Sequence, residues 1–135
     1  RYRNSFEFDY NFPKEMIQAK TPKLILQPIV ENSIMHGFLG KKSHGSLRIR
    51  GLQKKDKMVI TITDNGCGIP SEELRRIMAG ERRKSYHGGG FGLRNIDERI
   101  KLAFGESYGL RVRSKYGIGT QVSIFLPLDE RGELP

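Results

Sequence analysis

Apolar and polar side chains alternate along several stretches of the chain, and this alternation predicts five β-strands. The first is expected at residues 2–10, where the face formed by every second residue is mostly aromatic. The other four are expected to form two hairpins, each closed by a short turn: residues 46–53 with 58–64, and residues 109–114 with 119–126.

The same alternation assigns two polar residues to the apolar side of these strands. Asp64 falls on the face of Ile60 and Ile62, and Thr120 falls on the face of Val122, so both side chains are expected to point inward. A buried carboxylate needs hydrogen-bond donors, because burying an unpaired charge is costly.

Apolar residues at helical spacing predict a long helix over residues 21–38. Thr21 is expected to cap it, with Pro22 at its first position. Pro28 lies inside this segment, so a kink or an irregular first part is expected there. The apolar stripe of this helix consists of Leu26, Ile29, Val30 and Ile34.

Two further helices are expected later in the chain. Residues 71–78 form a short helix with Ser71 as its cap and acidic residues in its first turn. Residues 79–90, which are polar and rich in glycine, are expected to form a mobile loop. The helix after them ends at Gly105, a position suited to a left-handed cap, and its predicted apolar face consists of Leu93, Ile96, Ile100 and Ala103.

These elements predict an α/β fold in which helices pack on one sheet. A length of 135 residues suits a single domain, which we expect to span residues 1–127 and to be followed by a frayed tail, residues 128–135. Because the first predicted strand starts at the very beginning of the chain, we expect the sequence to be a piece of a longer protein.

The chain is basic, with 24 lysine and arginine residues against 15 acidic ones and a formal charge of +9. This charge favours anionic partners. The basic residues are scattered without interleaved aromatic residues, which argues against nucleic-acid binding. No stretch predicts a membrane span or a signal peptide. Cys67 stands alone, which excludes an internal disulfide and fits a reducing cytosol.

Three sequence motifs contain residues that suggest a ligand-binding site. In PIVENSIMHG, Asn32 and His36 lie one helical turn apart and off the apolar stripe. An amide oxygen there can ligate magnesium that arrives with phosphates. An ordinary solvated polar face explains the same pattern.

The second motif, VITITDNGCGIP, ends the strand that carries Asp64. Gly66 and Gly68 would allow a sharp turn and leave room for a flat ring, while the carboxylate would accept a hydrogen bond from an exocyclic amine. Alternatively, Asp64 caps the backbone amides of a common turn and the glycines supply positive φ.

The third motif, HGGGFGLRN, places four glycines before a helix whose first free amides favour phosphate. It matches neither a Walker loop nor a dinucleotide fingerprint. The hydroxyl of Thr120, on a later strand, is expected to bridge to Asp64 or to a ligand.

The order of these motifs resembles the ATPase superfamily of gyrase, heat-shock chaperones, histidine kinases and MutL. More narrowly, LILQPIVENSIMHGF, DNGCGIP and GGGFGLRNIDERIKLAFGE resemble the catalytic and ATP-binding domain of LytS-type sensor histidine kinases, over about residues 6–127. The resemblance implies a two-layer α/β sandwich of the Bergerat type, with a mixed, mostly antiparallel sheet packed on about three helices.

The resemblance also implies roles for individual residues. Asn32 would ligate magnesium, with Glu31 and His36 beside it as catalytic residues, and Asp64 would read the adenine amine with support from Thr120. An ATP lid would span about residues 71–90. Many relatives carry a lysine where Met35 stands, so a lid cation from Arg82, Arg83 or Lys84 is expected to replace it. The remaining implied ATP-binding residues are Gly66, Gly68, Ile69, Gly88, Gly90, Gly92 and Leu93.

In function, the resemblance implies a domain that binds Mg-ATP and donates the γ-phosphate to a histidine on an upstream dimerisation domain absent from this chain. None of His36, His44 and His87 lies in such a helical segment, so the chain alone is not expected to autophosphorylate. A response regulator downstream, a homodimeric full-length protein and a cytoplasmic location next to a membrane sensor are implied as well. An anti-sigma-type serine kinase and a non-catalytic nucleotide-binding or docking module are the alternatives.

Overall fold

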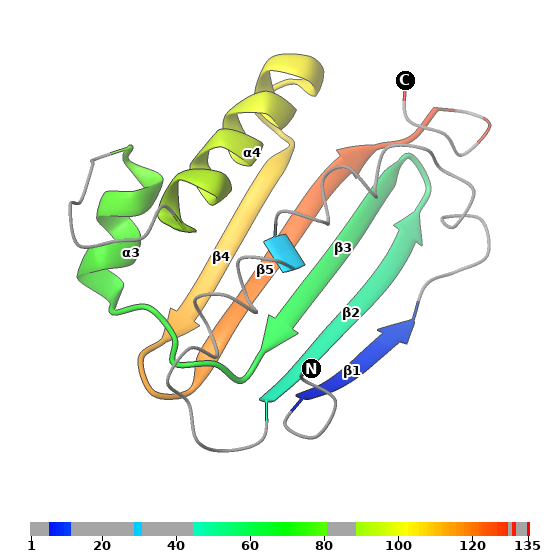
Figure 1. Cartoon of the computed structure of the whole chain (residues 1–135). Coiled ribbons are helices and arrows are strands. Elements are labelled where there is room, and N and C mark those ends of the chain that lie inside the picture. Colours follow the sequence, from blue (N-terminus) through cyan, green and yellow to red (C-terminus); the bar gives the residue numbers. More distant parts are fainter. Residues whose placement is uncertain (1–5, 12–28, 31–44, 81–88, 130, 132–134) are drawn as a thin grey trace.

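The computed structural model describes residues 6–11, 29–30, 45–80, 89–129, 131 and 135. Its centre is a five-stranded sheet with the strand order β1-β2-β3-β5-β4 (Figure 1). The strands are β1 Phe6–Asn11, β2 Gly45–Lys54, β3 Lys57–Asp64, β4 Gly109–Lys115 and β5 Gly119–Pro127. Strand β1 pairs in parallel with β2, and the other three pairs are antiparallel. The expected mixed, mostly antiparallel sheet is confirmed.

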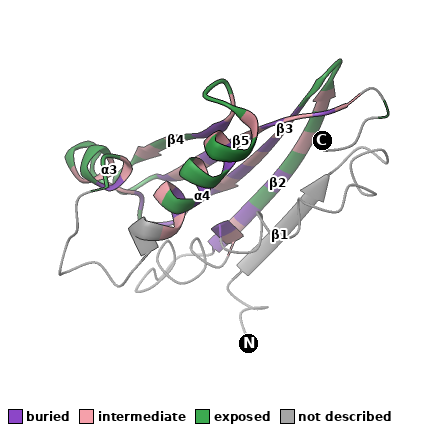
Figure 2. Ribbon diagram, turned by 90° about the horizontal axis from the view of Figure 1, so that it is seen from above, coloured by how far each residue is buried: buried purple, intermediate pink, exposed green. Residues whose placement is uncertain are grey.

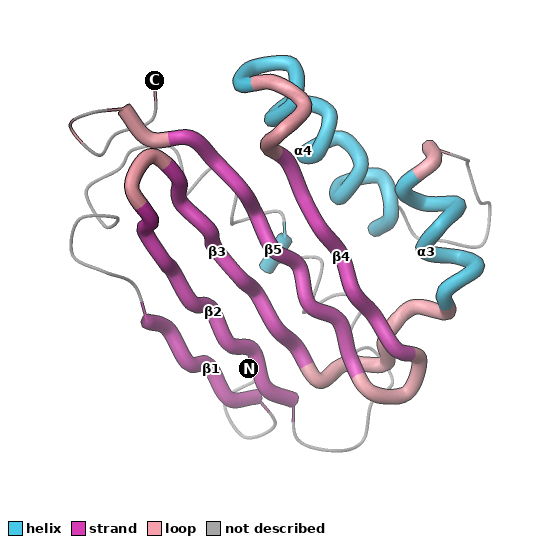
Figure 3. The backbone as a smooth tube through the Cα atoms, turned by 180° about the vertical axis from the view of Figure 1, so that it is seen from behind, coloured by secondary structure: helices cyan, strands magenta, loops and turns pink. Residues whose placement is uncertain are grey.

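Two helices pack beside one another on the same side of this sheet. They are α3, Ser71–Met78, and α4, Gly89–Phe104, and the view from above shows α4 below the sheet, with α3 near the end of the edge strand β4 (Figure 2). Seen from behind, the five strands run side by side across the opposite face (Figure 3). The layered α/β fold follows from strands that are apolar on one side and helices that are apolar along one stripe.

The core lies between the sheet and α4. In β3 every second residue from Met58 to Asp64 is buried, and in β5 the same holds from Val122 to Leu126, as the alternation in the sequence predicts. Leu93, Ile96 and Ile100 of α4 are buried in the same cluster. The fourth predicted apolar residue of this helix, Ala103, is exposed. Phe104, one turn after Ile100, packs partly against the core instead.

The predicted helix at residues 21–38 falls largely outside the described residues. Its described part, Ile29 and Val30, is helical. Ile29 is fully buried in the core cluster and Val30 packs partly against it, as the stripe predicts. Leu26, Pro28 and Ile34 lie outside the described residues.

Two helix boundaries differ from the sequence prediction, and one agrees with it. Ser71 does not cap α3, because it is already the first helical residue; Pro70 takes the cap position and no side chain caps the helix. Gly89 and Gly90, predicted as loop, are the first residues of α4. The predicted stop at Gly105 is confirmed: its φ is +108° and its amide donates to the Lys101 carbonyl at 2.8 Å.

The ordered chain continues past the predicted domain end at residue 127. Leu128 is buried in the core cluster, and its amide donates to the carbonyl of Asp56 at 2.7 Å. Leu128, the first residue of the predicted tail, thus covers the end of the β2–β3 hairpin. None of the helices in the described ranges combines the length and the apolar composition that crossing a bilayer requires.

Candidate functional site

Three inward-facing polar side chains lie in one row across neighbouring strands, at one end of the sheet. Across neighbouring strands, Asp64 of β3 pairs with Thr120 of β5, and Thr120 pairs with Ser114 of β4. Residues directly opposite one another in antiparallel strands lie on the same face. All three therefore share the face that carries the core, and they lie next to the loop that follows β3.

Asp64 is the only polar or charged side chain that is buried among the described residues, at 8% exposure. Its Oδ1 accepts hydrogen bonds from the main-chain amide of Gly66 at 2.9 Å and from that of Thr120 at 3.1 Å. A buried carboxylate is stable only when donors of this kind surround it. Asp64 therefore does cap backbone amides of the turn, and these bonds also fix the orientation of its carboxylate.

The loop after Asp64 is held from both sides. On one side, Asn65 accepts the amide of Ser46 through its Oδ1 at 2.7 Å. On the other, the carbonyl of Cys67 accepts the amide of Gly117 at 2.6 Å. The loop is thus joined to β2 and to the turn between β4 and β5, so its position depends on two hairpins.

Gly68 of this loop has a φ of +75°, and a Cβ at this position would overlap the carbonyl oxygen of Lys115. The protein's own backbone therefore requires glycine here. The predicted positive φ in this turn is confirmed at Gly68.

Ser114 is the residue that sequence reasoning missed. Its Oγ accepts the amide of Ile69 at 2.7 Å, donates to the carbonyl of Gly119 at 3.0 Å and lies 2.7 Å from the Oγ1 of Thr120. The sequence prediction could not place it opposite Thr120, because the predicted turn at residues 115–118 pairs Ser114 with Gly119, whereas in the structure Lys115 pairs with Gly119 and Ser114 with Thr120.

The contacts of Thr120 differ from those expected. Its main-chain amide, and not its hydroxyl, donates to Asp64, while the hydroxyl pairs with Ser114. The predicted direct bridge from the hydroxyl to Asp64 is therefore not among the contacts of the structure. The reason is register, since the Ser114 hydroxyl lies directly across the strand pair at hydrogen-bonding distance.

The glycine cluster before Leu93 forms the first turn of α4. Gly92 lies inside this helix, and a Cβ added to it would meet no atom within 4 Å. The first amides of a helix have no partner within the helix and carry partial positive charge. Leu93, next in the chain, is 2% exposed and anchors this turn in the core. Among the described residues, the start of α4 therefore combines space beside Gly92 with amides that have no partner within the helix.

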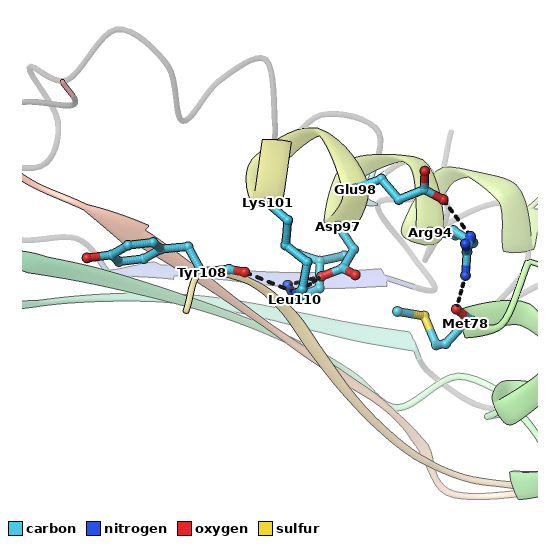
Figure 4. A network of polar contacts seen from close by, with 7 residues as sticks. All are labelled: Met78, Arg94, Asp97, Glu98, Lys101, Tyr108 and Leu110. Carbon is cyan, nitrogen blue, oxygen red and sulfur yellow. Dashed lines mark hydrogen bonds and ion pairs between the residues drawn. The ribbon is translucent and has the colours of Figure 1, made fainter. Parts of the chain in front are cut away.

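Two side chains fasten α4 to its neighbours (Figure 4). Arg94 donates through Nη1 to the carbonyl of Met78 at 2.5 Å and through Nε to Glu98 at 2.5 Å, so it joins α4 to the last residue of α3. Further along α4, Asp97 accepts the amide of Leu110 at 2.8 Å and the Nζ of Lys101 at 2.7 Å. The start of α4 is therefore held relative to both α3 and β4.

Several predicted site residues lie outside the described residues: Glu31, Asn32, Met35, His36, Arg82, Arg83, Lys84 and Gly88. The structure thus brings together Asp64, Thr120 and the loop with Gly66, Gly68 and Ile69. The part of the chain that it describes holds no group of three or more histidine, cysteine or acidic residues suited to a metal ion.

Comparison with known proteins gives consistent matches. A sequence profile of the family "Histidine kinase-, DNA gyrase B-, and HSP90-like ATPase" matches residues 18–130. The sensor histidine kinase YesM of Bacillus subtilis is 36% identical over 127 residues, which cover 94% of this chain and 20% of the relative. The sensor protein LytS of Staphylococcus epidermidis is 34% identical, with 94% of this chain and 21% of the relative covered. The chain thus spans about a fifth of the length of these relatives.

Solved structures show the same fold. The catalytic domain of the histidine kinase ThkA has a TM-score of 0.68 and 14% identity, over 98% of this chain and 83% of that domain. The histidine kinase domain of a blue-light activated histidine kinase from Erythrobacter litoralis has a TM-score of 0.63 and 20% identity, over 96% of this chain and 55% of that domain.

Proposed function

Since the chain belongs to the family of histidine kinase-, DNA gyrase B- and HSP90-like ATPases, we propose that it is the ATP-binding catalytic domain of a two-component sensor histidine kinase. It would bind Mg-ATP and present the γ-phosphate to a histidine on an upstream dimerisation domain of the same protein. The curated relatives with the same motifs carry the names of sensor histidine kinases.

The observation that carries this proposal is the buried carboxylate of Asp64. Main-chain amides orient it at the end of a central strand, beside a loop whose position Gly68 and Ser114 fix. A preoriented acceptor in a site with low exposure selects a ligand that brings N–H donors. The exocyclic amine of adenine is such a donor, so the residues present fit the base of ATP.

The other proposed roles follow the order of the motifs around Asp64. Gly66, Gly68 and Ile69 would line the adenine ring, and Thr120 would support Asp64. Gly88, together with Gly90, Gly92 and Leu93 at the start of α4, would receive phosphate oxygens, since free helix amides favour anions. Asn32 would ligate magnesium, with Glu31 and His36 beside it as catalytic residues.

The proposed phosphoryl transfer requires little covalent chemistry from the protein. ATP supplies the phosphoryl group when it is bound, and catalysis depends on positioning it and on neutralising its charge. This chain would hold the base, orient the phosphates and exclude water. A cation from Arg82, Arg83 or Lys84 would supply the charge that Met35 does not.

We propose residues 1–127 as the catalytic domain, extended by the buried Leu128, and about residues 71–90 as the lid over the nucleotide. The full-length protein would be a homodimeric membrane sensor whose catalytic domain faces the cytoplasm. It would pass its phosphate to a response regulator, and nucleic acid would not be a partner.

Calorimetry on the isolated domain tests nucleotide binding. We expect ATP and ADP to bind, ATP more tightly with magnesium, and GTP to bind much more weakly because guanine presents a carbonyl where adenine presents an amine. Equal affinity for GTP and ATP would overturn the role of Asp64. Absence of binding to any nucleotide would instead favour the docking module.

Transfer is tested on the full-length protein with labelled ATP. A histidine kinase yields an acid-labile, base-stable phosphoprotein, whereas a serine kinase yields an acid-stable one. Acid-stable label on a partner protein would contradict the proposed acceptor and support the anti-sigma-type alternative.

A further inference from the structure

Ser114 joins three parts of the proposed adenine site through one oxygen atom. Its Oγ contacts the amide of Ile69 in the loop after β3, the carbonyl of Gly119 at the start of β5, and the hydroxyl of Thr120. It belongs to none of the motifs in which the site was predicted, and it lies one strand away from Thr120.

The positions of the protons in this cluster follow from counting donors. A serine hydroxyl has one proton to donate and two lone pairs to accept with. The carbonyl of Gly119 cannot donate, so the proton of Ser114 must be directed to it across the 3.0 Å contact. The amide of Ile69 donates to one lone pair of Ser114.

One contact then remains, in which the Oγ of Ser114 lies 2.7 Å from the Oγ1 of Thr120. Since the only proton of Ser114 is already used, Thr120 has to be the donor. The hydroxyl of Thr120 is therefore held with its proton toward β4, and the rest of its oxygen offers lone pairs only.

From this arrangement we propose that Ser114 is a specificity-determining positioning residue. By fixing the proton of Thr120, it makes Thr120 an obligatory acceptor beside the carboxylate of Asp64, so this end of the site presents acceptors alone. The inference rests on the proposed function, and it adds that base selection depends on a residue that does not itself contact the base.

The ligand chemistry that distinguishes this arrangement is the 6-position of a purine. A 6-amino group donates, and meets acceptors favourably, directly or through one water molecule. A 6-oxo group only accepts and would face lone pairs, which costs binding free energy because buried polar groups remain unpaired. ATP and ITP carry these two groups on otherwise closely similar purines.

The experiment compares the dissociation constants of ATP and ITP for the domain and for Ser114→Ala. In the variant the proton of Thr120 is free to turn toward a 6-oxo group. We expect the preference for ATP over ITP to fall about tenfold, the size of one unmade buried hydrogen bond. An equal loss for both nucleotides, with the preference unchanged, would mean that Ser114 is only structural and would overturn the inference.

Two further variants separate positioning from packing. Ser114→Thr keeps the hydroxyl and is expected to keep the preference. Ser114→Ala combined with Thr120→Val is expected to show the same preference as Thr120→Val alone, because Ser114 acts through Thr120. Additive losses of preference in the double variant would contradict that route.

Folding of each variant is checked by circular dichroism. If Ser114→Ala does not fold, Ser114→Cys keeps nearly the same shape with a much weaker hydrogen-bonding group. It is expected to lower the preference about threefold, and an unchanged preference would again overturn the inference. Wild-type protein that binds neither nucleotide overturns the proposed function and the inference together, whereas a wild-type preference that survives in the variants overturns the inference alone.

Discussion

Two glycine-rich regions border the proposed site, and they contain glycine for different reasons. In the loop after β3, Gly68 has a positive φ, and a Cβ there would overlap the backbone of Lys115. In the first turn of α4, Gly92 is helical and a Cβ would meet nothing within 4 Å. The sequence shows both as glycine clusters, but only the structure shows which one the fold itself requires.

The difference has a functional meaning. A glycine that the protein's own backbone requires says nothing about a ligand, since packing explains it fully. A glycine in open space inside a helix costs stability relative to alanine. The described protein gives no reason for glycine at Gly92, so we expect the reason to be a ligand that approaches the backbone.

The largest expected effect is on folding, from Gly68→Ala. Positive φ and overlap with a carbonyl both penalise a side chain here, so we expect a loss of more than about 3 kcal/mol in the free energy of unfolding. Denaturant unfolding measures it. Gly117→Ala is the matched control, because Gly117 has a φ of +86° with open space around it. It should lose only about 1 kcal/mol, and equal losses would show that the contact with Lys115 contributes nothing.

The next effect is on binding, from Asp64→Asn. The amide oxygen of asparagine can still accept the amides of Gly66 and Thr120, so the fold should remain. The amide nitrogen would face the ligand with a donor, and ATP binding should weaken by about 2 kcal/mol, as measured by calorimetry. Asp97→Asn serves as the control: Asp97 also accepts a main-chain amide, that of Leu110, but on β4. If Asp97→Asn weakened ATP binding as strongly, the effect of Asp64→Asn would be structural.

Gly92→Ala tests the comparison at the start of α4. We expect the domain without nucleotide to gain about 0.5–1 kcal/mol in stability, because alanine is the better helix former. ATP binding should weaken roughly tenfold if phosphates approach this backbone. Thermal melting and calorimetry on the same preparation give both values. Greater stability with unchanged affinity would show that this turn does not meet the phosphates.

The smallest effect is expected from Arg94→Gln, which removes the bond to the Met78 carbonyl. Arg94 is partly exposed, and we expect a loss of about 1 kcal/mol or less in stability. Hydrogen exchange of the amides of α3 should rise while that of the strands stays unchanged. Arg99→Gln on the exposed side of α4 is the control. Identical exchange in both variants would mean that Arg94 does not hold α3.

The sequence predicted the elements that depend on local pattern. Both hairpins and the inward position of Asp64 follow from a period of two, and α4 follows from Leu93, Ile96 and Ile100 at helical spacing. The local pattern gave the wrong residue where contacts with neighbouring residues determine the structure. Ser71 had the composition of a cap but follows a proline that takes the cap position, and Ala103 gave way to Phe104, which reaches the core with a larger side chain.

The sequence could predict individual residues of the candidate site but not the contacts that join them. Motifs along the chain pointed to Asp64, Gly68 and Thr120, because each stands in a segment of unusual composition. Ser114 stands in an ordinary strand, and its importance arises from one contact with a residue distant in the sequence, Ile69, and from two contacts across its own hairpin. Such a role depends on strand register and on proton counting, which composition does not reveal.

The bond between Arg94 and the Met78 carbonyl also bears on how this fold tolerates change. It fixes the two points from which the intervening chain departs and to which it returns. The entropy of closing a loop between fixed points grows only with the logarithm of its length, about 0.6 kcal/mol for each doubling. Insertions and deletions before the start of α4 should therefore alter the sheet and the core very little, so evolution can change the length of this segment while the first turn of α4 and Leu93 stay in place.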